Sequence, residues 1–363
     1  MDEYKIEEQK QESSQELLNQ KIIISTDNPL SDRIIYFCNC YDNGDLTEMT
    51  NTLYYLSDNI SHLEVYDIPN EITISFIQIL FGLFNDFFKQ GDPEAFFENP
   101  KPDYLINIIN IIANLIKFLP FEYFTSEPLI ETAFLCFHSI LVNKEEQKAP
   151  ALSKSMDIFF PILINMTSRQ EFGTEINQLI TFENINGFYL NPLINSNQKE
   201  NILKIFLNIL HNSDVTEEDF PLGDSFLLIT RILQNFDSKH TYLFIRIIYL
   251  LLENPLIATQ IMTDITFTNF INSCLNTSFL KSIYQKDTMI NEIHFCALKS
   301  ISLVLNLDEY SIDFDVSKVI ELSQCEDNPE LMFAAMETLQ NFVDCEQHVH
   351  IMLESQIFGY DRT

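Results

Sequence analysis

Tryptophan is absent from this sequence and glycine is scarce, with 7 Gly among 363 residues. Ordinary proteins contain about 7 % Gly. Folds built on tight turns, phosphate-cradling loops or strained backbone need more Gly than this chain has. An all-β sandwich, a barrel and a doubly wound nucleotide-binding fold are therefore disfavoured. The 46 % hydrophobic content also argues against a disordered chain. These facts predict a mostly helical protein whose helices end at Pro, Asn, Asp and Ser.

Basic residues are also few, because 21 Lys and Arg face 53 Asp and Glu, for a net charge of −32. Nucleic-acid binding and attachment to anionic membranes both depend on Lys and Arg, and no basic run exists. We therefore expect neither nucleic acid nor a membrane among the partners. A field this negative favours proteins with basic segments. The alternative is that the acidity only keeps an apolar protein in solution.

Signals for export or membrane insertion are not recognisable in the sequence. The first twenty residues are polar and acidic, unlike a signal or transit peptide, and no uninterrupted apolar run reaches the ~18 residues of a membrane span. Seven widely spaced Cys suggest reduced, buried thiols. We expect a cytoplasmic protein, with the nucleus as the alternative compartment. Residues 1–28 are expected to form an acidic, disordered tail.

From residue 29 to 363 the sequence predicts a single stack of helices. Apolar residues recur every three or four positions, as in Ile202, Ile205, Phe206 and Ile209. Helix starts are marked by a capping residue before Pro, as at Asn328-Pro329. The predicted helices cover 46–60, 71–90, 103–119, 128–142, 151–168, 173–183, 197–211, 223–236, 239–253, 258–275, 287–306, 315–324, 328–343 and 346–356. A helical chain of this length without a flexible linker favours a solenoid over one globular core.

A weak internal repeat supports the solenoid. Several long helices share the pattern apolar, any residue, Asn, apolar, with the Asn at positions 114, 165, 208, 306 and 341. These Asn are 51, 43, 98 and 35 residues apart. The interval of 98 has room for two units, and the missing unit would fall in residues 244–254. The mean spacing is then about 45 residues, within the 40–47 of armadillo and HEAT units.

The pattern resembles the last helix of the armadillo repeat, whose motif ends in Ala-Leu-x-Asn-Leu. The segments ALKSISLVLNL (297–307) and AAMETLQNF (334–342) are the most similar to it. The resemblance covers residues 70–356 and implies an all-α, right-handed α-α superhelix of the armadillo/HEAT type. In that family the last helix lines the concave face, and its Asn residues hold the backbone of an extended peptide.

By this resemblance the candidate groove residues are the five Asn and several residues one turn before them. They are Asn110, Asn114, Asn165, Lys204, Asn208, Ser302, Asn306, Glu337 and Asn341. The alternative is that these side chains cap or decorate helices. The family's nuclear-import adaptors carry Trp four residues before the Asn. Here those positions hold Asn110, Pro161, Lys204, Ser302 and Glu337, which argues against a receptor for nuclear-localisation signals.

Motifs of enzymes and metal sites are missing. The sequence has no Gly-rich phosphate loop, no Gly-x-Ser-x-Gly and no His-Glu-x-x-His, so no catalytic residue, cofactor or metal is expected. Cys38-Asn39-Cys40 and the set Cys345, His348 and His350 are too incomplete for zinc. The sequence favours a non-enzymatic scaffold, adaptor or regulatory subunit. The alternatives are a divergent importin-like transport receptor and, more remotely, an enzyme with an unrecognised helical site.

Overall fold

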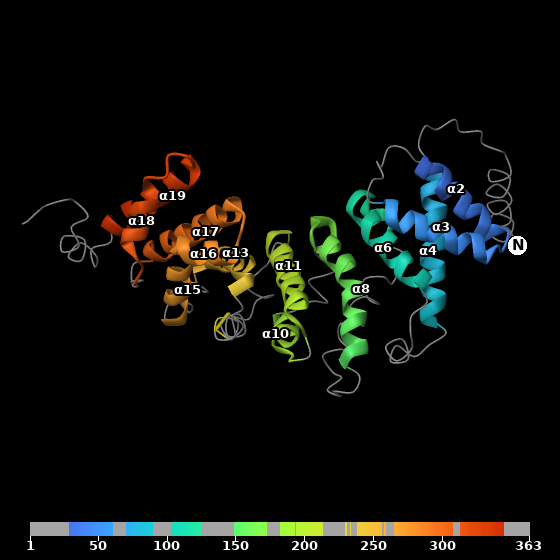
Figure 1. The fold of residues 1–363 in the computed structure, drawn as a ribbon, viewed down its shortest axis with the longest axis horizontal. Coiled ribbons are helices and arrows are strands. Elements are labelled where there is room, and N and C mark those ends of the chain that lie inside the picture. The colour runs from blue at the N-terminus through green and yellow to red at the C-terminus, as the bar shows by residue number, and fades with distance from the viewer. Residues whose placement is uncertain are drawn as a thin grey trace, which may run out of the picture. The chain divides into compact units, whose positions relative to one another are not determined.

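The computed structural model describes an all-α protein (Figure 1). The described residues are 29–60, 70–89, 103–124, 149–172, 182–192, 194–212, 229–230, 233, 238–255, 258, 265–307 and 313–344. All regular elements in these ranges are α-helices or short 3-10 helices. The prediction of a helical fold is therefore confirmed, while the predicted tail, 1–28, lies outside the described residues.

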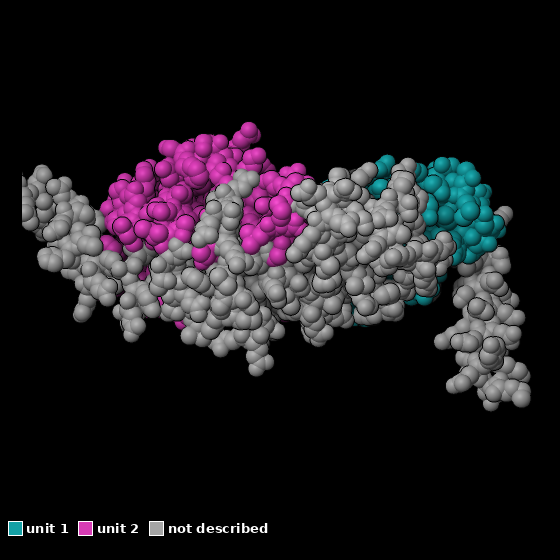
Figure 2. Space-filling view, turned by 90° about the horizontal axis from the view of Figure 1, so that it is seen from below, with its two compact units in different colours: residues 1–136, 150–166 teal, residues 137–149, 167–363 magenta. Residues whose placement is uncertain are grey.

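The chain divides into two compact units, which Figure 2 colours separately. Unit 1 contains residues 1–136 and 150–166, and unit 2 contains 137–149 and 167–363. Each unit has its own packed helices and is described by itself below. The expectation that 29–363 form a single solenoid stays a prediction.

Unit 1 is built from long helices that pack on one another in pairs. They are α2 (Pro29–Asp42), α3 (Leu46–Asn59), α4 (Asn70–Lys89), α6 (Asp103–Phe118) and most of α8 (Ala149–Thr167). Helix α2 packs on α3 and α4, and α6 packs on the same two helices. Rings of Phe37 and Phe76 meet edge to face with centroids 5.4 Å apart, and both side chains are fully buried. Aromatic burial of this kind is a main source of core stability.

In unit 2 the helices stack in sequence order. The unit contains α10 (Phe182–Leu190), α11 (Ser196–Asn212), α13 (Thr241–Leu252), α15 (Ile265–Leu275), α16 (Thr277–Ile283), α17 (Asp287–Leu305), α18 (Val316–Ser323) and α19 (Pro329–Asp344). We call α11, α13, α17 and α19 the stacking helices, because each packs on the next. The shorter helices cover them: α10 packs on α11, α15 and α16 on α17, and α18 on α19. Successive units that bury their faces on their neighbours define a helical-repeat architecture.

Helix ends in this chain depend on Asp and Asn, as the low Gly content predicts. The side chain of Asp45 accepts the backbone N–H of Glu48, and Asp315 accepts those of Ser317 and Lys318. Helix α19 begins at Pro329, and Asn328 Oδ1 lies 3.2 Å from the backbone nitrogen of Leu331. Such caps stabilise a helix by about 0.5–2 kcal/mol. The turn between α2 and α3 uses Gly44 with φ +69°, a conformation that costs Gly little.

Three described helices, α2, α10 and α16, were not predicted. Helix α10 overlaps the predicted helix 173–183 only at its first two residues. Helix α2 buries Leu30, Ile34 and Phe37 at helical spacing, but its polar sequence hides the pattern. Helix α16 has seven residues and only Leu280 buried, too little for periodicity to detect. The predicted helix 258–275 is described only at 258 and as α15, which starts at Ile265. The predicted helices 128–142 and 346–356 lie outside the described residues, as do most of 173–183 and 223–236.

Helix α17 is long and apolar enough to cross a membrane, and no other helix in the described ranges is. Its apolar window is 61 % buried within the protein. Ile293, Leu298 and Ile301 are fully buried, and α13 and α19 pack on the helix. We therefore assign α17 as a core helix of unit 2.

Candidate protein-binding face

Eight of the nine candidate groove residues lie on five long helices. Helix α6 carries Asn110 and Asn114, and α8 carries Asn165; both belong to unit 1. In unit 2, α11 carries Lys204 and Asn208, α17 carries Ser302, and α19 carries Glu337 and Asn341. Asn306 directly follows α17. Most of these side chains are half-buried, but Ser302 is buried and both Asn306 and Glu337 are exposed.

Three of the Asn amides donate a hydrogen bond to the preceding long helix. In unit 1, Asn165 Nδ2 lies 2.6 Å from the carbonyl oxygen of Ala113 in α6. In unit 2, Asn208 Nδ2 lies 3.2 Å from the hydroxyl of Thr167, and Asn341 Nδ2 lies 2.7 Å from the hydroxyl of Ser302. The bonded residues are 52, 41 and 39 positions apart. The recurring Asn therefore marks where one long helix is joined to the next, at roughly the spacing of one repeat.

Asn114 and Asn306 do not follow this arrangement. Asn114 Nδ2 donates to the carbonyl of Asn110 in its own helix at 2.9 Å, and its Oδ1 lies 3.3 Å from Lys117 Nζ. Asn306 is the exposed C-cap of α17, and its backbone N–H bonds to Ser302 O and Val304 O. One turn earlier in α17, the hydroxyl of Ser302 accepts a hydrogen bond from the amide of Asn341. The hydroxyl of Ser302 is 4 % exposed, so it lies between the helices.

Charged side chains one turn before the Asn residues form ion pairs. Lys204 Nζ lies 2.7 Å from Glu200 Oε1 within α11, and Lys299 of α17 pairs with Glu337 of α19. These side chains are 28–51 % exposed, so solvent weakens their attraction. Near Asn208 and Asn341 the stacking helices therefore present an amide beside a partly exposed ion pair.

Helix α13 contains no Asn, and the one Asn in residues 244–254, Asn254, lies beyond its end. The helix contacts α17 through other polar side chains. Arg246 Nε lies 3.1 Å from Glu292 Oε1 of α17, and Tyr242 OH donates to Glu292 Oε2 at 2.7 Å. Burial and the hydrogen bond to Glu292 raise the pKa of Tyr242. Glu292 is 46 residues from Arg246 and 50 residues from Tyr242, and no motif links the three, so sequence reasoning missed this cluster. The only signal in the sequence was that these separations equal about one repeat.

Buried groups outside this face have the chemistry of core residues. Burial raises the pKa of Cys38 and Cys296 to about 12 and raises the pKa of Cys274 well above its usual value, so all three are protonated thiols at neutral pH. Within the described ranges no three His, Cys, Asp or Glu side chains lie close enough together to hold a metal ion. Cys345, His348 and His350 lie outside those ranges.

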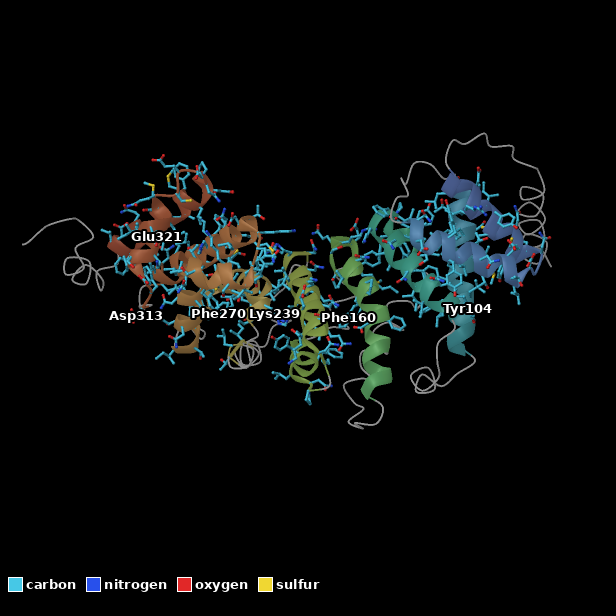
Figure 3. The ribbon with its side chains drawn as sticks, in the orientation of Figure 1. Tyr104, Phe160, Lys239, Phe270, Asp313 and Glu321 are labelled. Carbon is cyan, nitrogen blue, oxygen red and sulfur yellow. The ribbon has the colours of Figure 1, made fainter. Side chains whose placement is uncertain are left out.

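Three side chains labelled in Figure 3, Lys239, Phe270 and Asp313, belong to segments of unit 2 next to the stacking helices. The Phe270 ring of α15 meets that of Phe244 in α13 edge to face, with centroids 5.3 Å apart. The carbonyl of Lys239, before α13, accepts the Tyr284 hydroxyl at 2.9 Å. The carbonyl of Asp313, before α18, accepts Asn272 Nδ2 at 3.1 Å. The two polar contacts join residues 45 and 41 positions apart, which is about one repeat.

Comparisons with known proteins return designed repeat proteins. No protein-family model matches the sequence, and no curated protein matches it. A designed armadillo repeat protein is 11 % identical with a TM-score of 0.48, over 69 % of this chain and 98 % of that one. An engineered protein of the Northeast Structural Genomics Consortium is 12 % identical with a TM-score of 0.46, over 69 % and 96 %. A second from that consortium is 10 % identical with a TM-score of 0.45, over 90 % and 84 %.

The class of the fold follows from the helix packing. Long helices stack in sequence order within unit 2, shorter helices cover them, and hydrogen bonds join residues about one repeat apart. The predicted resemblance is confirmed at this level: the chain has a helical-repeat architecture of the armadillo/HEAT type.

Proposed function

We propose that this protein is a non-enzymatic scaffold, adaptor or regulatory subunit, which binds an extended segment or helix of another protein along its Asn-bearing helices. One observation carries the proposal: Asn165, Asn208 and Asn341 are each half-buried, and each is fixed by a hydrogen bond from its amide to the preceding helix. Long repeat surfaces of this kind suit extended partners.

The chemistry of an amide suits a peptide backbone. The side chain of Asn offers two N–H donors and a carbonyl acceptor. The bond between Asn341 and Ser302 uses one N–H and fixes the plane of the amide, so the side chain loses little further freedom when a partner binds. Each hydrogen bond gained would contribute about 0.5–1.5 kcal/mol. Such amides on the helices of one unit would therefore bind a backbone regardless of its side chains.

Charge favours a partner with basic segments. Three basic side chains of the stacking helices are already paired with acids: Lys204 with Glu200, Arg246 with Glu292 and Lys299 with Glu337. The chain as a whole carries a net charge of −32. Lys and Arg on a partner would therefore meet an excess of carboxylates, and their encounter would be accelerated.

A peptide-display selection on the full-length protein tests the proposal. Random 12-residue peptides selected on the wild-type chain would be measured against Asn114→Ala and Asn208→Ala. Asn114 makes no described bond to another helix, so its replacement tests binding with the least effect on stability. We expect at least tenfold weaker binding, which is about 1.4 kcal/mol. The matched control is Asn43→Ala, an exposed Asn whose amide bonds only to Asn39 O in the α2–α3 turn. Equal affinity for wild type and both variants would reject this face as the binding site.

A further inference from the structure

Helix α19 exposes two large apolar side chains. Phe333 is 64 % exposed and Met336 is 51 % exposed. They are three residues apart, so they lie side by side on the helix surface. Leu331, Ala334 and Thr338 are buried, and they face the neighbouring helices. The exposed pair therefore lies on the side of α19 that points away from its described neighbours.

This face is where another helix would continue the stack. Helix α13 packs between α11 and α17, and α17 packs between α13 and α19. Among the described elements, α19 has only α17 as a stacking neighbour, with α18 covering it. A helix that docks on Phe333 and Met336 would complete for α19 the arrangement that α13 and α17 already have.

The border of the face is acidic. Residues 319–344 contain no Lys or Arg, and they contain six acids: Glu321, Glu326, Asp327, Glu330, Glu337 and Asp344. Glu330 lies one turn before Phe333, and both Glu330 and Asp344 are exposed on α19. Glu337 is the member of the set that pairs with Lys299. The apolar pair is therefore flanked by carboxylates on one edge.

We propose that the exposed face of α19 binds a basic amphipathic helix of another protein. Apolar side chains of that helix would contact Phe333 and Met336, and its Lys or Arg would lie opposite Glu330 and Asp344. A second copy of this chain would set acids against acids. The segment 345–363 of this chain carries three acids and one Arg, so its charge does not match either. Glu337 lies one turn after Phe333 and one turn before Asn341, so the surface adjoins the Asn-bearing positions of α19. The proposal rests on Phe333 and Met336 and not on the Asn residues.

The probe is an 18-residue peptide of Leu and Lys with its leucines on one helical face. A peptide of the same composition with scattered leucines is the control probe. Binding to the full-length protein would be measured by fluorescence anisotropy at physiological salt. We expect the double variant Phe333→Ser/Met336→Ser to bind the amphipathic peptide at least tenfold more weakly. The matched variant is Ile265→Ser, which removes a 78 % exposed side chain of α15 and should change the affinity less than twofold.

A second pair of substitutions tests the charge. Glu330→Gln/Asp344→Gln should weaken binding severalfold and reduce its dependence on salt. Three results would overturn the proposal. The double apolar variant could bind as tightly as wild type. It could melt several degrees lower, showing that the chain's own residues cover the face. Finally, wild type could sediment as a dimer that this variant abolishes, which would assign the face to a second copy.

Discussion

The amide nitrogen of Asn341 lies 2.7 Å from the hydroxyl oxygen of Ser302, and this bond joins α19 to α17. Ser302 is 4 % exposed, so its hydroxyl has little access to water. One turn earlier, the buried Thr338 hydroxyl lies 3.1 Å from the carbonyl oxygen of Leu298, on the same two helices. The contact between the last two stacking helices is thus polar as well as apolar.

Replacing Asn341 by Ala should destabilise the protein, because it leaves the Ser302 hydroxyl buried without its donor. We expect a loss of about 1–3 kcal/mol in the free energy of unfolding. The double variant Ser302→Ala/Asn341→Ala should recover part of the loss, which urea denaturation would show as a coupling of about 0.5 kcal/mol or more. Asn306→Ala is the control, because that exposed side chain should cost less than about 0.5 kcal/mol. Simple additivity of the two single variants would contradict the bond.

Acid should weaken unit 2 through His294. Burial lowers the pKa of His294 to about 4, although the carbonyl of Cys274, 2.9 Å from Nδ1, opposes that shift. The unfolded chain binds this proton near pH 6.5. Stability is therefore complete above pH 6.5 and is lost as the pH falls toward 4, by about 1.4 kcal/mol per unit for this group.

The comparison that isolates this effect uses His294→Asn, whose amide can donate to the Cys274 carbonyl. Urea midpoints of wild type and variant would be measured at pH 7.5 and pH 5. The wild type should lose more stability than the variant over this interval, since all other titrating groups are common to both. Parallel losses would show that His294 is not buried as a neutral side chain.

Thiol reactivity should separate the cysteines by burial. Cys38, Cys274 and Cys296 are buried with raised pKa values, whereas Cys325 is half-buried. Because the thiolate is the reactive species, iodoacetamide at pH 7.5 should label Cys325 well before the other three. Peptide mass spectrometry over a time course gives the rates, and labelling in urea should equalise them. Early labelling of Cys274, which is fully buried, would contradict the packing of α15 on α17.

The aromatic contact between α13 and α15 should be among the costliest to remove. Phe244 is fully buried, and its ring meets Phe270 edge to face. Phe244→Ala should cost about 3–5 kcal/mol in the free energy of unfolding. Phe118→Ala removes a 40 % exposed ring from α6 and should cost far less. Denaturation followed by circular dichroism would measure both, and similar losses would contradict the burial of Phe244.

Long helices with one apolar face were the most predictable part of the fold. The predicted helices 103–119, 197–211, 287–306 and 328–343 differ from α6, α11, α17 and α19 by at most one residue at either end. Their periodicity is clear because stacking buries one face of each. Helix α16 was not predicted, since a seven-residue helix with one buried side chain depends on its Asn276 cap and on contacts with α15 and α17.

The candidate site was predictable as a set of positions but not as a set of contacts. The spacing of the Asn residues indicated that they recur on successive long helices. It could not indicate that Asn165 would donate to a backbone carbonyl while Asn208 and Asn341 donate to hydroxyls. These choices depend on the offset between neighbouring helices, which core packing sets. The same offset makes Ser302, and not Asn306, the acceptor in α17, although Asn306 fits the motif better.

Each cross-helix hydrogen bond made by α11 and α19 also closes a long loop of chain. These bonds join Asn208 to Thr167, Thr338 to Leu298 and Asn341 to Ser302, over separations of 39–41 residues. A fully extended chain spans about 3.3–3.6 Å per residue, so each such segment has a contour of roughly 130–150 Å. Under tension applied along the chain, opening the Asn208–Thr167 contact, or the two contacts between α17 and α19 together, would release a length of that order. Unit 2 would therefore lengthen under load in steps as these contacts open.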